Sequence, residues 1–286
     1  MSNRPFRSVL YLPASNVRAL QKARTLPVDA LILDLEDAVA PHDKVAARET
    51  LAAALREGGF GDRYISVRIN GFDTPWGEDD LSALAPLAPD AVLLPKVNRW
   101  SDIESTANRL DAFASAKDTA IWAMIETPEG VLNAAEIARA PRMAGFVLGT
   151  NDLAKDLTSR SREALRTALQ MTLLAARAAR IICVDGVYNA FRDVDGLKAE
   201  CEEGRDYGFH GKSLIHPLQI ETANTVFAPS EAEIDLARRQ IQAFDEALAE
   251  GSGLAVLDGS IVENLHVETA RMTLAQAEII AQRAEG

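Results

Sequence analysis

Carboxylate residues stand where apolar runs of the sequence end. The run from Ile121 ends in Glu126, and about one strand-and-helix unit later the run from Met143 to Gly149 leads into Asp152. Such runs, bounded by turn residues, are typical of strands buried on both faces, so the first charged residue lies where the strand leaves the core. Because no His or Cys accompanies this pair, oxygen ligation of a hard cation, above all Mg²⁺, is one interpretation. Pairing with an arginine or capping of the following helix is the other, and spacing alone supports both equally.

Other charged residues occupy comparable places. Arg68 stands near the exit of another apolar run, and Glu36 and Asp37 directly follow a third. An arginine at a strand end either pairs with a neighbouring acid or holds a substrate carboxylate through two N–H groups. Arg18 and Lys22 are four residues apart on a predicted helix and therefore share one face, which is either solvated or placed to bind phosphate.

Eight short apolar runs alternate with helical patterns along the chain. The runs cover residues 9–12, 30–35, 63–70, 91–96, 121–126, 143–149, 181–187 and 211–217. Eight strands, each followed by a helix, predict an α/β protein whose residues 1–228 form a (β/α)₈ TIM barrel. A doubly wound sheet would carry a G-x-G-x-x-G turn after its first strand, and this chain has Pro13-Ala-Ser-Asn there. In a barrel the carboxyl ends of the strands meet at one face, so the candidate residues converge.

Residues 229–286 predict a C-terminal helical and flap extension. Pro229-Ser-Glu begins a helix with a capping box that runs to about residue 249. Asp258-Gly259 is a strong hairpin dipeptide between two short apolar segments, and an amphipathic helix follows over about 265–283. A flap of this kind beside a barrel mouth is expected to act as a lid.

Composition limits the classes of partner. Lys and Arg number 30 against 42 Asp and Glu, and the formal net charge of −12 argues against nucleic acid and anionic membranes. No apolar run approaches the ~18 residues of a membrane span, and the N-terminus lacks an apolar leader segment. Cys183 and Cys201 have no metal-like spacing and predict reduced packing residues in a cytoplasmic protein.

Six short motifs occur together and in order. They are Arg7-Ser-Val-Leu-Tyr-Leu-Pro-Ala-Ser, Leu33-Asp-Leu-Glu-Asp-Ala-Val, Val67-Arg-Ile-Asn, Leu94-Pro-Lys, Met124-Ile-Glu-Thr and Gly149-Thr-Asn-Asp-Leu. In this combination the chain resembles the HpcH/HpaI aldolase and citrate lyase family, in the branch of the citrate lyase beta subunit and the malyl-CoA lyases. The resemblance extends over nearly the whole chain, including Gly211-Lys-Ser-Leu-Ile-His-Pro.

The resemblance implies a Mg²⁺-dependent barrel enzyme acting on CoA thioesters of β-hydroxy acids. It makes Glu126 and Asp152 the metal ligands and assigns to Glu36 and Asp37 the orientation of water around the metal. The positions that it implies for substrate binding are Arg68, Glu126, Arg18 and Lys22, the last two near the CoA phosphates. It also implies a homo-oligomer, trimeric or hexameric, in which the lid carries a catalytic acid/base and closes over the site of a neighbouring subunit.

At the lid the sequence departs from the family pattern. Lyases of the family place an Asp in a Gly-Ser-x-Ile-Asp context, whereas this chain reads Gly259-Ser-Ile-Val-Glu263. The expected catalytic residues are Arg68 and Glu263, with Glu263 as the acid/base. Asp258 is the alternative to Glu263. The main expectation is retro-Claisen cleavage of a malyl-CoA-like ester to acetyl-CoA or propionyl-CoA and a 2-oxo acid such as glyoxylate.

Two other functions stay open. The segments Ile261-Val-Glu-Asn-Leu-His and Val184-Asp-Gly-Val-Tyr-Asn-Ala resemble the malyl-CoA thioesterases of the same family, which makes hydrolysis to malate and CoA the close alternative. A non-catalytic CoA-ester-binding subunit of a larger complex is the third, although Glu126, Asp152 and Arg68 are all retained. No nucleic acid or membrane partner is expected.

Overall fold

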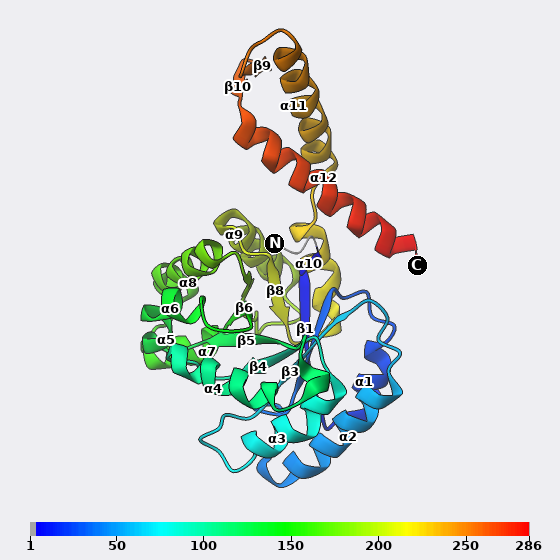
Figure 1. The fold of residues 1–286 in the computed structure, drawn as a ribbon, viewed down its shortest axis with the longest axis vertical. Helices are drawn as coiled ribbons and strands as arrows, with labels where there is room; N and C mark the ends of the chain where they lie inside the picture. The colour runs from blue at the N-terminus through cyan, green and yellow to red at the C-terminus, as the bar shows by residue number, and fades with distance from the viewer. Residues whose placement is uncertain (1–3, 286) are drawn as a thin grey trace. The chain divides into compact units, whose positions relative to one another are not determined.

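The chain forms two compact units in the computed structural model, which describes residues 4–285 (Figure 1). One unit comprises Phe6–Asn224, and the other comprises residues 225–285 together with residues 4 and 5. The predicted division into a barrel domain of residues 1–228 and an extension of residues 229–286 stays a prediction. Residues 1–3 and 286 lie outside the described residues. Over the described part of the chain, no helix combines the length and apolar character needed to cross a membrane.

Eight parallel strands close into a barrel, which confirms the predicted fold (Figure 1). The strands are β1 (Ser8–Pro13), β2 (Ala30–Asp34), β3 (Tyr64–Arg68), β4 (Ala91–Leu94), β5 (Ala120–Ile125), β6 (Met143–Leu148), β7 (Ile182–Asp185) and β8 (Gly211–Leu214). Each pairs with its neighbour in sequence, and β8 returns to β1. Every strand lies within or beside the apolar run that predicted it.

Helices follow the strands and surround the barrel in Figure 1. They are α1 (Val17–Ala23), α2 (Lys44–Glu57), α3 (Gly77–Leu84), α4 (Trp100–Asp111), α5 (Pro128–Leu132), α6 (Ala134–Ile137), α7 (Thr150–Asp156), α8 (Arg166–Ala179), α9 (Val194–Tyr207) and α10 (Ile220–Phe227). A separate 3₁₀ turn, Arg162–Leu165, directly precedes α8. Tighter turns of this kind are frequent at helix N-termini.

The barrel interior is filled by side chains that alternate along each strand. Val9, Ile32, Leu93, Trp122 and Val147 belong to one buried cluster. Because successive side chains of a strand point to opposite faces, residues two and four positions further along also point inward. This alternation carries Asp34 and Glu126 to the mouth of the barrel, directly beyond the apolar layers.

The C-terminal unit contains two long helices and a hairpin. Its elements are α11 (Glu231–Ala249), β9 (Ala255–Leu257), β10 (Ser260–Val262) and α12 (Asn264–Glu285). Ser230 and Glu233 form the predicted capping box. Asp258 and Gly259 both have positive φ angles, 50° and 78°, as the two-residue turn requires. Phe244, Val262 and Val267 pack with neighbouring side chains as a small core of this unit.

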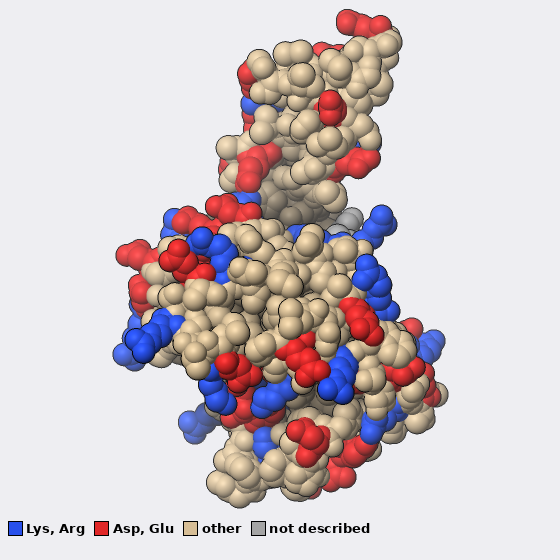
Figure 2. Space-filling view, turned by 90° about the vertical axis from the view of Figure 1, so that its left-hand side faces the viewer, with Lys and Arg blue, Asp and Glu red and all other residues tan. Residues whose placement is uncertain are grey.

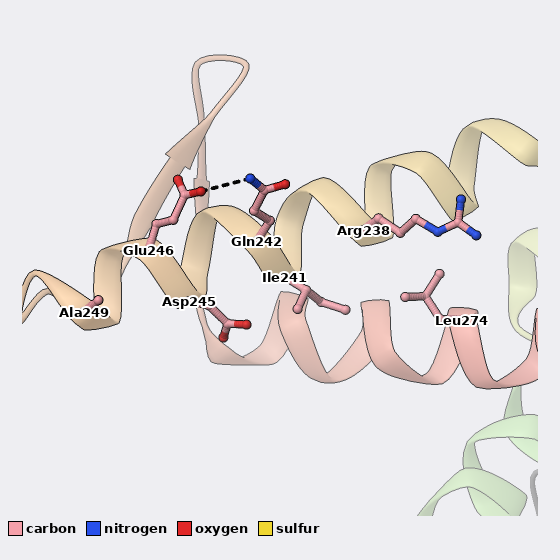
Figure 3. Close-up of a pocket in the computed structure, with 7 residues that line it drawn as sticks. All are labelled: Arg238, Ile241, Gln242, Asp245, Glu246, Ala249 and Leu274. Carbon is pink, nitrogen blue, oxygen red and sulfur yellow. Dashed lines mark hydrogen bonds between the residues drawn. The ribbon is translucent and has the colours of Figure 1, made fainter.

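Two surface features accompany these elements. An open groove of about 580 Å³ lies between α11 and α12, with Ile241 and Leu274 facing each other across it (Figure 3). Gln242 donates to Glu246 at 2.9 Å on its rim. Over the barrel, Lys and Arg side chains are interspersed with Asp and Glu (Figure 2), so the net charge of −12 is not gathered into one acidic face in that view.

Closure of the barrel depends on a glycine. A Cβ built at Gly211, the first residue of β8, would lie 1.8 Å from the carbonyl oxygen of Phe6 and 2.7 Å from the Cα of Arg7. Both contacts are with backbone atoms, which cannot rotate away as a side chain could. Only a residue without a Cβ lets β8 approach β1 closely enough to pair with it.

We expect Gly211→Ala to destabilise the barrel because the added methyl group forces β8 away from β1. The free energy of unfolding should fall by about 3 kcal/mol or more, which lowers Tm by roughly 6–12 °C. Thermal unfolding followed by circular dichroism measures this. Gly253→Ala is the matched control, since a Cβ there has no atom within 4 Å. Equal Tm values for the two variants would contradict the role given to Gly211.

Candidate active site

Arg68 and Asp34 form a buried ion pair at the mouth of the barrel. Nε and NH2 of Arg68 donate to the two carboxylate oxygens of Asp34 at 2.7 and 2.6 Å. Asp34 also accepts the backbone N–H groups of Glu36 at 2.9 Å and Ala38 at 3.1 Å. With four charge-assisted hydrogen bonds, Asp34 fixes both the guanidinium and the loop that follows β2.

The same guanidinium has further neighbours. Its NH1 lies 2.9 Å from Oε2 of Glu36 and 3.5 Å from Oδ2 of Asp37. The ring of Tyr11 lies 5.0 Å from its central carbon, a cation–π contact. Three carboxylates and an aromatic face therefore hold one side chain, and the structure brings Arg68, Glu36 and Asp37 together as predicted.

Glu126 lies just beyond the end of β5 and is 1% exposed. Its Oε1 accepts the backbone N–H of Lys96 at 2.8 Å. Burial raises the pKa of Glu126 to about 7, with Glu36 and Asp152 adding to the rise, while the Lys96 N–H and Arg68 oppose it. The carboxylate of Glu126 therefore lies near other negative charges, and a nearby cation would stabilise its charged form.

Asp152 lies in the first turn of α7, half-buried. The helix is capped by Gly149 without a side-chain hydrogen bond, so Asp152 is not the cap. Its charge acts on Glu126, which places the two carboxylates in one electrostatic neighbourhood. Among residues 4–285, no group of three or more His, Cys, Asp and Glu side chains is arranged to hold a metal. Mg²⁺ in proteins usually binds through one or two carboxylates and keeps water or substrate oxygens at its other positions, so a ligand role for Glu126 and Asp152 stays a prediction.

Gly149 makes room for the Glu126 side chain. A Cβ at Gly149 would lie 2.3 Å from both Cβ and Oε2 of Glu126. Because Gly149 has no side chain, the carboxylate of Glu126 on the neighbouring strand has room beside it. Oε2 is the oxygen that the Lys96 N–H does not engage, so this space serves the atom available for a ligand.

Lys96 is a site residue that the sequence analysis left without a role. It follows β4 with a φ of 51°, a left-handed conformation uncommon for lysine. Its Nζ lies 3.5 Å from Oε1 of Glu36. Burial opposes its charge, but Glu36, Asp37, Glu126 and Asp152 outweigh this and raise its pKa. Asp34 and Tyr11 were also missed, although counting alternate residues back from the strand ends would have placed them inside the barrel.

A cavity of about 890 Å³ opens beside these groups. Glu36 and Lys96 lie at its wall, and the remainder comes from the end of β4, the loops after β3, β4 and β5, and α4. Residues that line it include Phe72, Thr74, Asn98, Ser101, Ser105, Asn108 and Thr127. It is large enough for the acyl part of a small-molecule ester.

Other candidate residues lie elsewhere. Arg18 and Lys22 are exposed on α1, as a phosphate-binding role requires, and that role stays a prediction. Asp185, the last residue of β7, is buried in ion pairs with Arg162 and Lys212 at 2.8 Å each. Asp185 therefore serves the packing of β7 and β8.

The two lid candidates differ in their contacts. Asp258 accepts from Arg239 at 2.6 Å and occupies the hairpin turn, so its carboxylate has a structural partner. The backbone N–H of Glu263 donates to Nδ1 of His266 at 3.0 Å, and the Glu263 side chain is exposed at the start of α12. A catalytic role for Glu263 stays a prediction.

The comparisons with known proteins agree with this geometry. Residues 7–217 match the HpcH/HpaI aldolase/citrate lyase family. The chain belongs to this family. It is 58% identical over 280 residues to a (3S)-malyl-CoA thioesterase of Cereibacter sphaeroides (strain KD131 / KCTC 12085), covering 97% of this chain and 96% of that protein. It is 36% identical over 288 residues to citrate lyase subunit beta of Escherichia coli (strain K12), covering 98% and 95%.

A solved member of the family has the same fold. The structure of CitE from Mycobacterium tuberculosis in complex with magnesium, acetoacetate and coenzyme A superposes with a TM-score of 0.81 at 30% identity, covering 97% of this chain and all of that one. The predicted family and the prediction of an enzyme are confirmed. Of the two reactions considered, the 58% identity supports the thioesterase better than the lyase, which was the main expectation.

The histidine near β8 is structural. The backbone N–H of Cys183 donates to Nδ1 of His210 at 3.0 Å, and Arg177 lies 3.2 Å from its Nε2. Burial, and then the charge of Arg177, lower the pKa of His210 to about 4. The ring therefore stays neutral over the physiological range and takes no part in proton transfer.

Gly149→Ala should displace the Glu126 carboxylate and weaken binding of Mg²⁺. The new Cβ occupies the place of Oε2, so we expect affinity to fall by about tenfold or more, a magnitude typical of lost ligand orientation. Calorimetric titration with MgCl₂ measures the affinity, and Tm shows whether the fold is retained. Gly253→Ala is again the control. A stable Gly149→Ala protein with wild-type Mg²⁺ affinity would remove Glu126 from the cation site.

His210 should make stability fall as the pH falls below about 6.5. Between that value and the folded-state pKa of about 4, only the unfolded chain takes up the proton, so stability is complete above the unfolded pKa and is lost towards acid. By pH 5 the loss should be about 2 kcal/mol. Urea unfolding of wild type and His210→Asn at pH 7.5 and 5 measures it, with exposed His42→Asn as control. Identical pH slopes in wild type and His210→Asn would contradict the prediction.

Proposed function

We propose that this chain is a Mg²⁺-dependent thioesterase that hydrolyses a malyl-CoA-type β-hydroxyacyl-CoA to the hydroxy acid and CoA. The observation that carries the proposal is Glu126, buried at the barrel mouth with Oε1 fixed by a backbone N–H and Oε2 kept clear by Gly149. The 58% identity to a (3S)-malyl-CoA thioesterase supports the choice of reaction.

The proposed metal site consists of Glu126 and Asp152. Both are oxygen donors, and Glu36, Glu126 and Asp152 together concentrate negative charge that a divalent cation compensates. Bound Mg²⁺ would supply Lewis-acid polarisation of a substrate oxygen. The magnesium in the CitE structure supports this assignment.

The protein groups divide the remaining work. Arg68, held rigid by Asp34, keeps Glu36 in place beside the proposed cation site, and a bound cation would stabilise the negative charge that develops on the carbonyl oxygen as water attacks. Attack forms a C–O bond, and collapse breaks the C–S bond to release the CoA thiolate. One carboxylate must accept the proton of the water and return a proton to sulfur, and we assign this role to Glu263.

Retro-Claisen cleavage is the second candidate, supported by the 36% identity to a citrate lyase beta subunit. Loss of the β-hydroxyl proton would break the carbon–carbon bond and leave the enolate of acetyl-CoA, which is protonated at carbon. The barrel residues would serve both reactions. The reactions differ in whether water enters and in which atom receives the proton.

We also propose the setting in which the enzyme works. We place the enzyme in the cytoplasm, because its proposed substrates are CoA thioesters and its two cysteines are buried and unpaired. A homo-oligomer in which the lid of one subunit covers the site of another would bring Glu263 to Glu126. Arg18 and Lys22 are proposed to meet the CoA phosphates.

Purified protein with Mg²⁺ and (3S)-malyl-CoA should release free thiol and malate. Glu126→Gln and Asp152→Asn should each reduce turnover by about 100-fold or more, because each removes a charge from the cation site. Thiol titration and chromatography of the acids measure the products. The controls are Glu129→Gln and Asp156→Asn, both exposed acids of the following helices, which should keep wild-type turnover. Glyoxylate and acetyl-CoA without free thiol would favour the lyase instead.

A further inference from the structure

Arg68 is committed to protein carboxylates. Three of its nitrogens meet Asp34 and Glu36 at 2.6–2.9 Å, Asp37 adds a longer contact, and its side chain is only 8% exposed. Its single positive charge therefore faces more than one negative charge already. An incoming anionic group gains little from a cation that is neutralised in this way.

Lys96 has the opposite character. Its side chain is 56% exposed, and its ion pair is a single contact of 3.5 Å with Glu36. It lies at the wall of the 890 Å³ cavity, on the side where Glu36 and the barrel mouth meet. A long, partly free ammonium group can turn from Glu36 to a ligand without breaking a buried pair.

The backbone of Lys96 ties this ammonium to the reacting centre. The left-handed conformation, φ 51°, disfavours a residue with a Cβ, and it accompanies the N–H bond to Glu126. Strained backbone of this kind persists where the surrounding structure holds it. One residue thus fixes a carboxylate of the proposed cation site through its main chain and extends its charge into the adjoining cavity.

We propose that Lys96 binds the free carboxylate of the acyl group and so makes the enzyme selective for dicarboxylic acyl thioesters. The inference rests on the proposed function for the class of substrate, a CoA ester, and it holds whichever bond of that ester is cleaved. The aliphatic arm of Lys96 reaches the carboxylate, and Glu36 is its partner when the cavity is empty.

The test compares binding of succinyl-CoA and butyryl-CoA. Both have four-carbon acyl chains without a hydroxyl group, and they differ in a terminal carboxylate or methyl group. Calorimetry or competition with a fluorescent CoA analogue is carried out with Mg²⁺ and again in EDTA, so that a contribution of the metal to carboxylate binding is separated. The proteins are wild type, Lys96→Met, Lys96→Arg and Lys117→Met, the last an exposed lysine in the loop before β5.

Lys96→Met should weaken succinyl-CoA binding by about 10- to 100-fold and leave butyryl-CoA within twofold, in both buffers. Lys96→Arg should recover most of the loss, and Lys117→Met should match wild type. Methionine keeps the backbone N–H to Glu126, and Tm verifies the fold. Equal effects on both esters, or none, would overturn the proposal while the assay with malyl-CoA still decides the proposed function. A wild-type protein that binds succinyl-CoA no more tightly than butyryl-CoA would also overturn the proposal, and turnover of malyl-CoA would again decide the proposed function.

Discussion

The buried pair of Asp34 and Arg68 is the interaction on which the site depends. Asp34 accepts two hydrogen bonds from the guanidinium and two from the backbone after β2, so one carboxylate positions both the cation and the loop that carries Glu36. Removal of one partner of a buried pair costs about 3–5 kcal/mol, since the other charge is left uncompensated. Lys44 reinforces the same loop by donating to the carbonyl oxygens of Leu35 and Glu36 at 2.8 and 2.7 Å.

That arrangement leaves an excess of negative charge at the barrel mouth. Arg68 is already paired with Asp34 and Glu36, and the charges of Glu126 and Asp152 also act on Lys96. Because Glu126 is buried, water does not screen this excess of negative charge, and the pKa of Glu126 is raised. A divalent cation and an anionic substrate restore the balance together, which links the proposed metal site to the proposed role of Lys96.

The sequence predicted the barrel well because buried parallel strands leave continuous apolar runs. The same pattern located Glu126 and Asp152, because each is the first carboxylate after an apolar run. It placed Lys96 at a strand end without giving it a role, and it did not single out Asp34. Asp34 stands within the apolar run of residues 30–35, so it is not recognised as the first charged residue after the run. Lys96 has a left-handed backbone conformation, which its residue type does not indicate. The sequence also does not indicate that Gly149 contacts Glu126, because the two residues follow different strands of the barrel.

The lid was predicted in its parts but not in its chemistry. A capping box and an Asp-Gly turn are local signals, so α11 and the hairpin follow from a few residues. The role proposed for Glu263 requires a contact with the site of another subunit, and local signals do not encode such a contact. Asp258 illustrates the difference, because its place in the turn follows from the local Asp-Gly signal, whereas its ion pair with Arg239, 19 residues away, does not.

The choice between hydrolysis and carbon–carbon cleavage therefore depends on the lid more than on the barrel. Both reactions need the thioester polarised and Arg68 held in place, and both need a carboxylate that transfers a proton. Cleavage of the carbon–carbon bond demands that this group reach the enolate carbon in a site closed to water, whereas hydrolysis demands that a water molecule be admitted and deprotonated. Glutamate at position 263 extends the carboxylate by one methylene beyond an aspartate, about an ångström, and a misplacement of that size can cost about 10²-fold in rate. If Glu263 serves as the proposed acid/base, an arm one methylene longer than that of aspartate is poorly matched to the enolate carbon, which favours the proposed thioesterase.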